Sequence, residues 1–129
     1  MLEVYSSDIN VAAGATIPLY NITVDKGMSA ILSAPATIAL NRCGVYNVHL
    51  DGFAEAADAG TITVQMIKNG VPQPQAITSS TGAFGFDTLV QVTENNTCCC
   101  CTSPTTLQFI NSGATVTGMH VNVTVTKNG

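Results

Sequence analysis

Apolar and polar residues alternate one by one along several segments of this chain, and this pattern constrains its fold more than any other feature. The clearest examples are residues 61–67 and 121–126. A period of two sends successive side chains to opposite faces of a β-strand, whereas an amphipathic helix needs a period of about 3.6. The pattern also predicts strands at residues 17–24, 29–32, 37–40, 46–50, 75–79, 84–92, 107–111 and 114–117. About ten short strands separated by turns predict an all-β fold, a jelly-roll β-sandwich of antiparallel strands.

Two local features refine this prediction. Asn69 and Gly70 directly follow the strand at residues 61–67, and Asn-Gly is typical of a tight hairpin turn. Residues 53–59, which are rich in Ala, form the one candidate helical stretch. The stretch is too short for a stable helix, so we expect a loop or a continuation of the preceding strand.

The chain of 129 residues suits a single domain, because a chain of about this length buries roughly two-thirds of its unfolded surface. We expect residues 1–10 to form an N-terminal attachment arm and residues 11–129 to form the jelly roll. The N-terminal residues lack a basic segment followed by an apolar one, and no apolar run approaches the roughly 18 residues that cross a bilayer. The sequence therefore predicts neither a secretory signal nor a membrane anchor.

Charged residues are scarce. The chain has four Lys or Arg and eight Asp or Glu, so that 9% of its residues are charged, against about 25% in an average globular domain. This deficit indicates that partner subunits cover part of the surface. The four cationic residues are scattered singly along the sequence, whereas phosphate binding needs a concentrated basic footprint. Nucleic acid is therefore excluded as an expected partner.

Several segments resemble one known family of folds. A strand at residues 37–40 precedes Gly44-Val45-Tyr46, and residues 61–70 supply the next strand with its Asn-Gly turn. Together with residues 88–92, 107–113 and 121–127, these segments resemble the jelly rolls of complement globular heads and tumour-necrosis-factor-like proteins. The bacterial and bacteriophage versions are the most similar in character, including the C-terminal domains of collagen-like spore-surface proteins and small phage structural proteins.

The resemblance implies a compact homotrimer whose threefold axis is lined by apolar strands. The charge deficit independently favours assembly, because interface cores are depleted in charged side chains. The alternative is a monomer with a surface rich in Thr and Asn. The residues expected to be buried or interfacial are Ile22, Val24, Phe84, Phe86, Phe109 and Ile110.

Four consecutive cysteines, Cys98 to Cys101, are the oddest local feature. Adjacent Cα atoms lie about 3.8 Å apart, below the usual disulfide range, so any disulfide is expected to pair outward, to Cys43, another strand or another subunit. The spacing also differs from that of structural zinc sites. Three interpretations remain: buried free thiols, a disulfide, or a metal shared around a threefold axis with help from His49 or His120. Synthesis in a reducing cytoplasm favours free thiols, and we expect no bound metal or cofactor.

Catalytic motifs are absent from the sequence. His49 or His120 would need Asp51 or a cysteine brought close by folding to act as a base or activate a nucleophile. A strand histidine bonded to the backbone is the favoured interpretation, and we expect no enzymatic activity. Glu55 and Asp58 lie in an acidic stretch that resembles a calcium loop only in composition, and solvated carboxylates are the favoured reading.

The sequence thus favours a structural virion protein of a bacteriophage: a homotrimeric capsid decoration protein, or the knob of a fibre or spike. Its expected partner is another virion protein such as the major capsid protein, and it is expected to be made in the host cytoplasm without a membrane partner. The alternative is a trimeric module of a phage tail or a bacterial spore or cell surface, which binds a receptor or a host-surface glycan.

Overall fold

Ten strands in two antiparallel sheets make up the structure, a computed structural model that describes residues 1–27, 29–57, 60–92 and 105–128. In spatial order, the first sheet, called sheet A, contains β2 (Asn21–Asp25), β1 (Leu2–Val11), β10 (Val116–Asn128), β5 (Gly44–Ala56) and β8 (Ala83–Val92). The second, sheet B, contains β3 (Ala30–Ala34), β4 (Thr37–Leu40), β9 (Thr105–Asn111), β6 (Ile62–Lys68) and β7 (Val71–Ser80). This architecture confirms the predicted jelly-roll sandwich.

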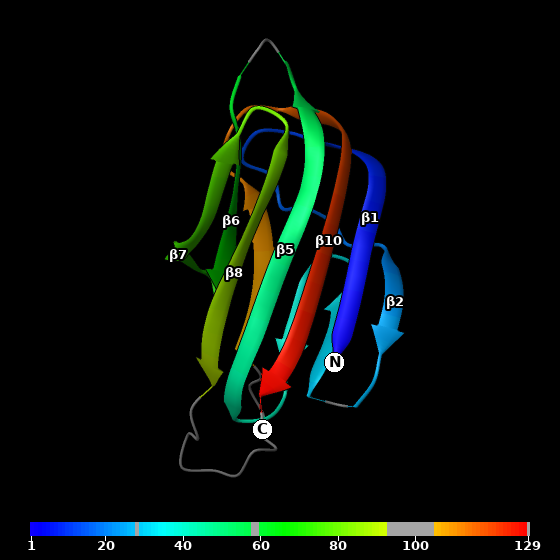
Figure 1. Cartoon of the computed structure of the whole chain (residues 1–129), viewed down its shortest axis with the longest axis vertical. Helices are drawn as coiled ribbons and strands as arrows, with labels where there is room; N and C mark the ends of the chain where they lie inside the picture. The colour runs from blue at the N-terminus through cyan, green and yellow to red at the C-terminus, as the bar shows by residue number, and fades with distance from the viewer. Residues whose placement is uncertain (28, 58–59, 93–104, 129) are drawn as a thin grey trace.

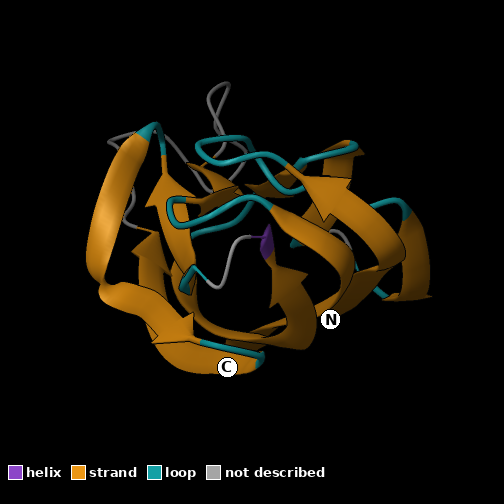
Figure 2. Cartoon of the chain, turned by 90° about the horizontal axis from the view of Figure 1, so that it is seen from above, coloured by secondary structure: helices purple, strands orange, loops and turns teal. Residues whose placement is uncertain are grey.

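The two sheets pack face to face, as the end-on view of Figure 2 shows. Sheet A lies toward the viewer in Figure 1, where its long strands run along the molecule and both termini lie at the same end. Alternate residues of each strand point between the sheets, as the period of two predicts. The core includes Leu2, Val48, Leu50, Val123 and Val125 from sheet A and Ile38, Leu40, Val64, Met66, Leu107 and Phe109 from sheet B, all at most 1% exposed.

The central strands agree with the sequence patterns. The strand predicted at residues 61–67 is observed as β6, at Ile62–Lys68, and Asn69 and Gly70 turn into β7 with positive φ angles of 51° and 80°. These angles fit the Asn-Gly hairpin turn that the sequence predicted. Residues 53–56 continue β5 rather than forming a helix, which confirms the strand continuation.

The N-terminal segment corrects the predicted domain boundary. Residues 2–11, expected to be almost entirely an attachment arm, form β1, which pairs with β10 on one side and with β2 on the other. Leu2 and Val4 are fully buried in the core. Because β1 lies inside sheet A and supplies core side chains, the sandwich begins at Leu2 and residues 1–10 are not a separate arm.

Residues 17–24 also differ from the prediction of one strand. Only Asn21–Asp25 forms a strand, β2. Before it, the Ile17 amide donates to the carbonyl of Phe109 at 2.7 Å, and the Leu19 amide donates to that of Pro35. Ile17 and Leu19 are nevertheless buried, so the apolar alternation in this segment reflects core packing without a regular ladder.

Tyr46, the aromatic residue of the Gly44-Val45-Tyr46 segment, is fully buried. Its hydroxyl donates to the carbonyl of Arg42 at 2.7 Å and lies 3.3 Å from that of Ser29. Burial raises the pKa of Tyr46 above its ordinary value, and the bond to Arg42 partly offsets this. The neutral hydroxyl therefore fastens the loop before β5 to the segment before β3.

Candidate functional site

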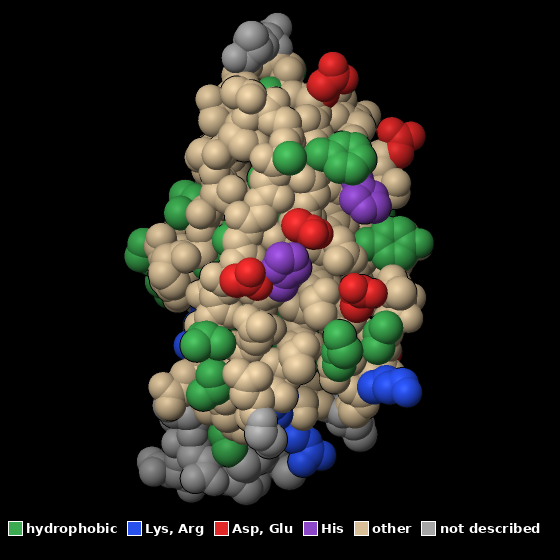
Figure 3. Space-filling model, in the orientation of Figure 1, with side chains coloured by type: hydrophobic (Ala, Val, Ile, Leu, Met, Phe, Trp, Pro, Cys, Tyr) green, Lys and Arg blue, Asp and Glu red, His purple; other side chains and the backbone are tan. Residues whose placement is uncertain are grey.

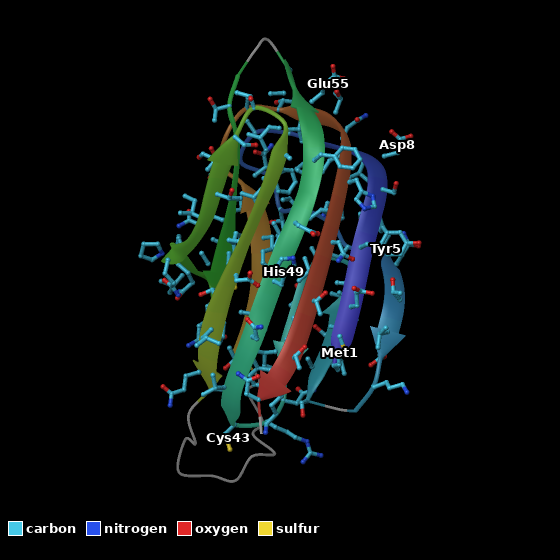
Figure 4. The ribbon with its side chains drawn as sticks, viewed as in Figure 1. Met1, Tyr5, Asp8, Cys43, His49 and Glu55 are labelled. Carbon is cyan, nitrogen blue, oxygen red and sulfur yellow. The ribbon has the colours of Figure 1, made fainter. Side chains whose placement is uncertain are left out.

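The outer face of sheet A carries most of the predicted functional residues. Along β5, His49, Asp51 and Phe53 alternate with the buried Val48 and Leu50 and therefore point away from the core. His49 lies near the middle of this face in Figure 4. Figure 3 shows the same face as a broad surface of mainly uncharged side chains.

His49 contacts two carboxylates. Its Nδ1 lies 2.7 Å from Oδ1 of Asp87 on β8, and its Nε2 lies 3.4 Å from Oδ2 of Asp51 on β5. A neutral imidazole donates from only one ring nitrogen, whereas an ionised carboxylate only accepts. Both contacts are therefore hydrogen bonds only when His49 is protonated. The hydrogen bond to Asp87 raises the pKa of His49, desolvation opposes the rise, and Asp51 adds to it.

The predicted pairing of His49 with Asp51 is thus present, but on an open surface. The side chains of His49 and Asp51 are 42% and 55% exposed. Asp87 was not predicted, although it is the cross-strand partner of His49 in the register of β5 and β8. That register depends on how two distant segments align, which the alternation within each segment does not determine.

His120 lies in a different environment. Its ring centroid is 5.4 Å from that of Phe53, with the planes 20° apart, and 6.3 Å from that of Tyr5. These three side chains, from β10, β5 and β1, are called the aromatic cluster below. Phe53 is 57% exposed, so the cluster presents an exposed apolar ring to its surroundings.

The backbones of β5 and β10 approach each other closely next to this cluster. A Cβ atom at Gly52 would collide with the carbonyl oxygen of His120, where a register shift between Thr117 and His120 interrupts the ladder of β10 with β5. Only glycine permits this approach of the strands. Gly52 therefore helps to bring Phe53 and His120 together.

Positive charge is scarce on this face. Within the five strands of sheet A the one Lys or Arg is Lys127, which pairs in register with the inward-facing Tyr46 and so lies on the opposite side from His49. Glu3, which accepts a hydrogen bond from Thr124 at 3.3 Å, adds a third carboxylate to those of Asp51 and Asp87. In Figure 3 the visible Lys and Arg side chains gather toward the end that carries the termini.

A second group of exposed apolar side chains lies on the neighbouring edge strands β7 and β8. Val71 and Ile77 on β7 and Leu89 on β8 are all substantially exposed. Leu89 shares the outer face of sheet A with Asp87, whereas Ile77, in register with Gln65, lies on the outer face of sheet B. These three side chains are called the edge group below. Of the residues expected to be buried or interfacial, Phe84 and Phe109 belong to the core, whereas Ile22 is half exposed on the other edge strand of sheet A, β2.

Of the other predicted site residues, the structure describes Cys43, directly before β5, and Glu55, near the opposite end of that strand (Figure 4). Cys43, which was named as a possible partner of any disulfide formed by the cysteine run, is disulfide-bonded. Residues 98–101 and Asp58 lie outside the described residues, and Glu55 is exposed on β5. Among the residues that the structure describes, no group of three or more His, Cys, Asp or Glu side chains is arranged to hold a metal ion, and no helix is long and apolar enough to span a membrane.

Comparison with solved structures identifies the class of fold as that of complement globular heads and tumour-necrosis-factor-like jelly rolls. The globular domain of zebrafish complement 1qA superposes with a TM-score of 0.68 at 6% identity, covering 98% of each chain. The PRD1 vertex protein P5 gives 0.69 at 15% identity, covering 99% of this chain and 96% of that one. Murine APRIL gives 0.65 at 7% identity, covering 98% of each. No protein-family model and no curated protein sequence matches the chain.

Proposed function

We propose that this protein is a structural virion protein of a bacteriophage, which assembles as a homotrimer and has no catalytic activity. The observation that carries the proposal is the outer face of sheet A, which presents the aromatic cluster and, within the five strands, no outward-facing Lys or Arg. Interface cores are enriched in aromatic residues and depleted in Lys, although this face also carries the carboxylates of Glu3, Asp51 and Asp87. A second copy of the chain is the occupant that this face fits best.

The two exposed apolar groups support a threefold arrangement. A cyclic trimer is built from heterologous contacts, in which one patch of each subunit meets a different patch of the next. The aromatic cluster on β1, β5 and β10 is one such surface, and the edge formed by β7 and β8, with exposed apolar side chains on both of its sides, is the other. We propose that the edge formed by β7 and β8 of one subunit packs on the outer face of sheet A of the next.

Two observations support a place in a virion. Likeness to a protein named as a vertex protein agrees with a role on a particle surface, and the charge deficit agrees with a chain built to assemble. Within a particle, the trimer would be a capsid decoration protein or a fibre or spike knob, with the major capsid protein or another virion protein as its partner.

One observation favours a second candidate, a trimeric receptor- or carbohydrate-binding module of a phage tail or bacterial spore surface. Exposed aromatic rings such as Phe53 and His120 also form surfaces on which a ligand stacks. The two candidates make opposite demands, because rings buried between subunits are not available to a glycan. Binding on a glycan array that is lost in a Phe53→Ser variant would favour this second candidate.

Sedimentation velocity tests the assembly directly. The wild-type chain of 13.3 kDa is expected to sediment as a trimer. Phe53→Lys adds a charge to an exposed side chain and is expected to give a folded monomer. Thr106→Lys is the matched control, since it adds the same charge to the outer face of sheet B and should leave the trimer intact. A wild-type chain that stays monomeric at micromolar concentration at every pH from 5.5 to 8.5 would contradict the proposal.

The virion role needs a separate measurement. Mass spectrometry of purified particles is expected to find the chain in a copy number divisible by three. Its absence from particles, with an intact trimer in solution, would refute the location while leaving the assembly in place.

A further inference from the structure

The centre of the proposed interface holds ionisable groups that an apolar contact would not need. His49 is bracketed by Asp87 and Asp51, at 2.7 and 3.4 Å. Burial of a charge between subunits is costly unless the charge is paired. His49, Asp51 and Asp87 are called the triad below. The protonation state of His49 in this triad therefore affects whether a second subunit is able to pack on the outer face of sheet A.

Counting charge on the triad gives two cases. With His49 protonated, one imidazolium offsets one of the two carboxylates and every ring nitrogen has an acceptor. With His49 neutral, both carboxylates are uncompensated and only one of them receives a hydrogen bond from the ring. Three subunits brought together multiply this uncompensated charge by three.

Within the same subunit, the strands around His49 supply no substitute cation. From β8 the titratable neighbour is Asp87. From β10 the residues in register with His49 and Asp51 are Thr124 and Asn122, which do not titrate. The next strand, β1, contributes Glu3, a further carboxylate, through its contact with Thr124.

We propose that protonation of His49 licenses association of the subunits through the outer face of sheet A, so that the trimer is stable at mildly acidic pH and dissociates as pH rises. This inference rests on the proposed homotrimer and makes its assembly dependent on pH. His49 is the proton-binding group, and Asp51 and Asp87 are the reason that a proton is required.

The sign of the pH dependence follows from the coupling between proton binding by His49 and association of the subunits. The contact with Asp87 raises the pKa of His49 above the ordinary value of about 6.5. The contact is already present in the folded single subunit, so association is strongest below the pKa of His49 in that subunit and weakens as pH rises above it. If each of three subunits must hold a proton, the association constant falls by up to about a thousandfold per pH unit above that pKa.

Sedimentation equilibrium from pH 5.5 to 8.5 tests the proposal in the full chain. The wild type is expected to lose at least tenfold in association constant per pH unit above the pKa of His49. His49→Gln should associate weakly with a flat pH profile, and Asp51→Asn with Asp87→Asn should associate tightly at every pH. His120→Gln is the matched control, expected to change the association constant but not its pH slope.

The outcomes separate the inference from the function on which it rests. The role of His49 is refuted if the association constant of the wild-type trimer does not change with pH. It is also refuted if the His49→Gln variant has the wild-type pH slope. Neither result contradicts the homotrimer itself. Absence of a trimer at every pH refutes the homotrimer itself. If His49→Gln fails to fold, the double Asn variant still decides, because a wild-type pH slope in that variant would contradict the proposal.

Discussion

Asn111, at the end of β9, is expected to be among the most sensitive polar positions in the protein. Its side chain is fully buried. The amide nitrogen donates to the carbonyls of Ala114 at 2.8 Å, Val11 at 3.2 Å and Ala12 at 3.4 Å, and Oδ1 accepts from the amide of Gly113 at 3.1 Å. One side chain therefore joins the end of β1, the following loop and the turn that leads into β10.

The perturbation is Asn111→Leu, which keeps the approximate volume and removes all four hydrogen bonds. The contact with Ala12 is long and counts for little, which leaves three bonds worth about 1 kcal/mol each. Their backbone partners stay in a buried setting, so water does not fully replace the lost bonds. We expect a loss of about 3 kcal/mol, equivalent to a fall of about 12 °C in Tm for a domain of this size.

Urea denaturation followed by circular dichroism measures this loss, at one protein concentration because assembly makes apparent stability depend on concentration. Asn21→Leu, on the exposed edge strand β2, serves as the control and should stay within about 0.5 kcal/mol of the wild type. Asn111→Asp keeps the acceptor but turns a carboxylate toward three carbonyls, and it should cost more than Asn111→Leu. Equal stability of Asn111→Leu and the wild type would refute the reasoning.

Three further predictions follow from the fold. Deletion of residues 1–10 removes nearly all of β1, with its buried Val4, from between β2 and β10 in sheet A and should abolish the β-sheet circular dichroism; a folded truncated protein would show that β1 is dispensable. Tyr46→Phe removes the hydrogen bond to the carbonyl of Arg42 and should cost about 1–2 kcal/mol in urea denaturation, whereas no loss would mean that water replaces the bond. Gly52→Ala should cost about 2–3 kcal/mol by overpacking against backbone, whereas Gly82→Ala, where an added Cβ has nothing within 4 Å, should change stability little; equal effects would contradict the close strand approach.

The strands with unbroken alternation were predictable from sequence, and β1 shows why the rest was not. Leu2 and Val4 follow the period of two, but the next inward position is Ser6, which is fully buried. Its hydroxyl donates to the carbonyl of Pro18 and accepts from the amide of Tyr20. A polar residue satisfied by a distant segment looks like the end of a strand when the sequence is read alone.

An irregularity in the backbone of β1 explains why the rest of this strand was not predicted. Asp8 has a positive φ of 55°, and the register of β1 with β10 shifts between Ser6 and Ile9. The shift moves later residues to the opposite face from the one that simple alternation predicts. A bulge of this kind depends on the partner strand and leaves no local pattern.

The contacts of the candidate site likewise include one that was predictable from the sequence and others that were not. The sequence paired His49 with Asp51, which are two residues apart on one strand and therefore share a face. It did not identify Asp87, 38 residues away, or the stacking of His120 on Phe53. These contacts arise from cross-strand register, which requires the whole sheet.

Pairing of β1 with β10 has a consequence for how the protein is made. Glu3 and Thr124, which are 121 residues apart in the chain, are bonded neighbours, so sheet A has no complete central ladder until the last strand has left the ribosome. Until then β1 exposes an unpaired edge and the apolar side chains of Leu2 and Val4. Folds dominated by such distant pairings form in about milliseconds to seconds, and nascent chains with open strand edges aggregate readily. Synthesis rate and chaperone supply should therefore limit the yield of this protein more than the stability of its finished fold.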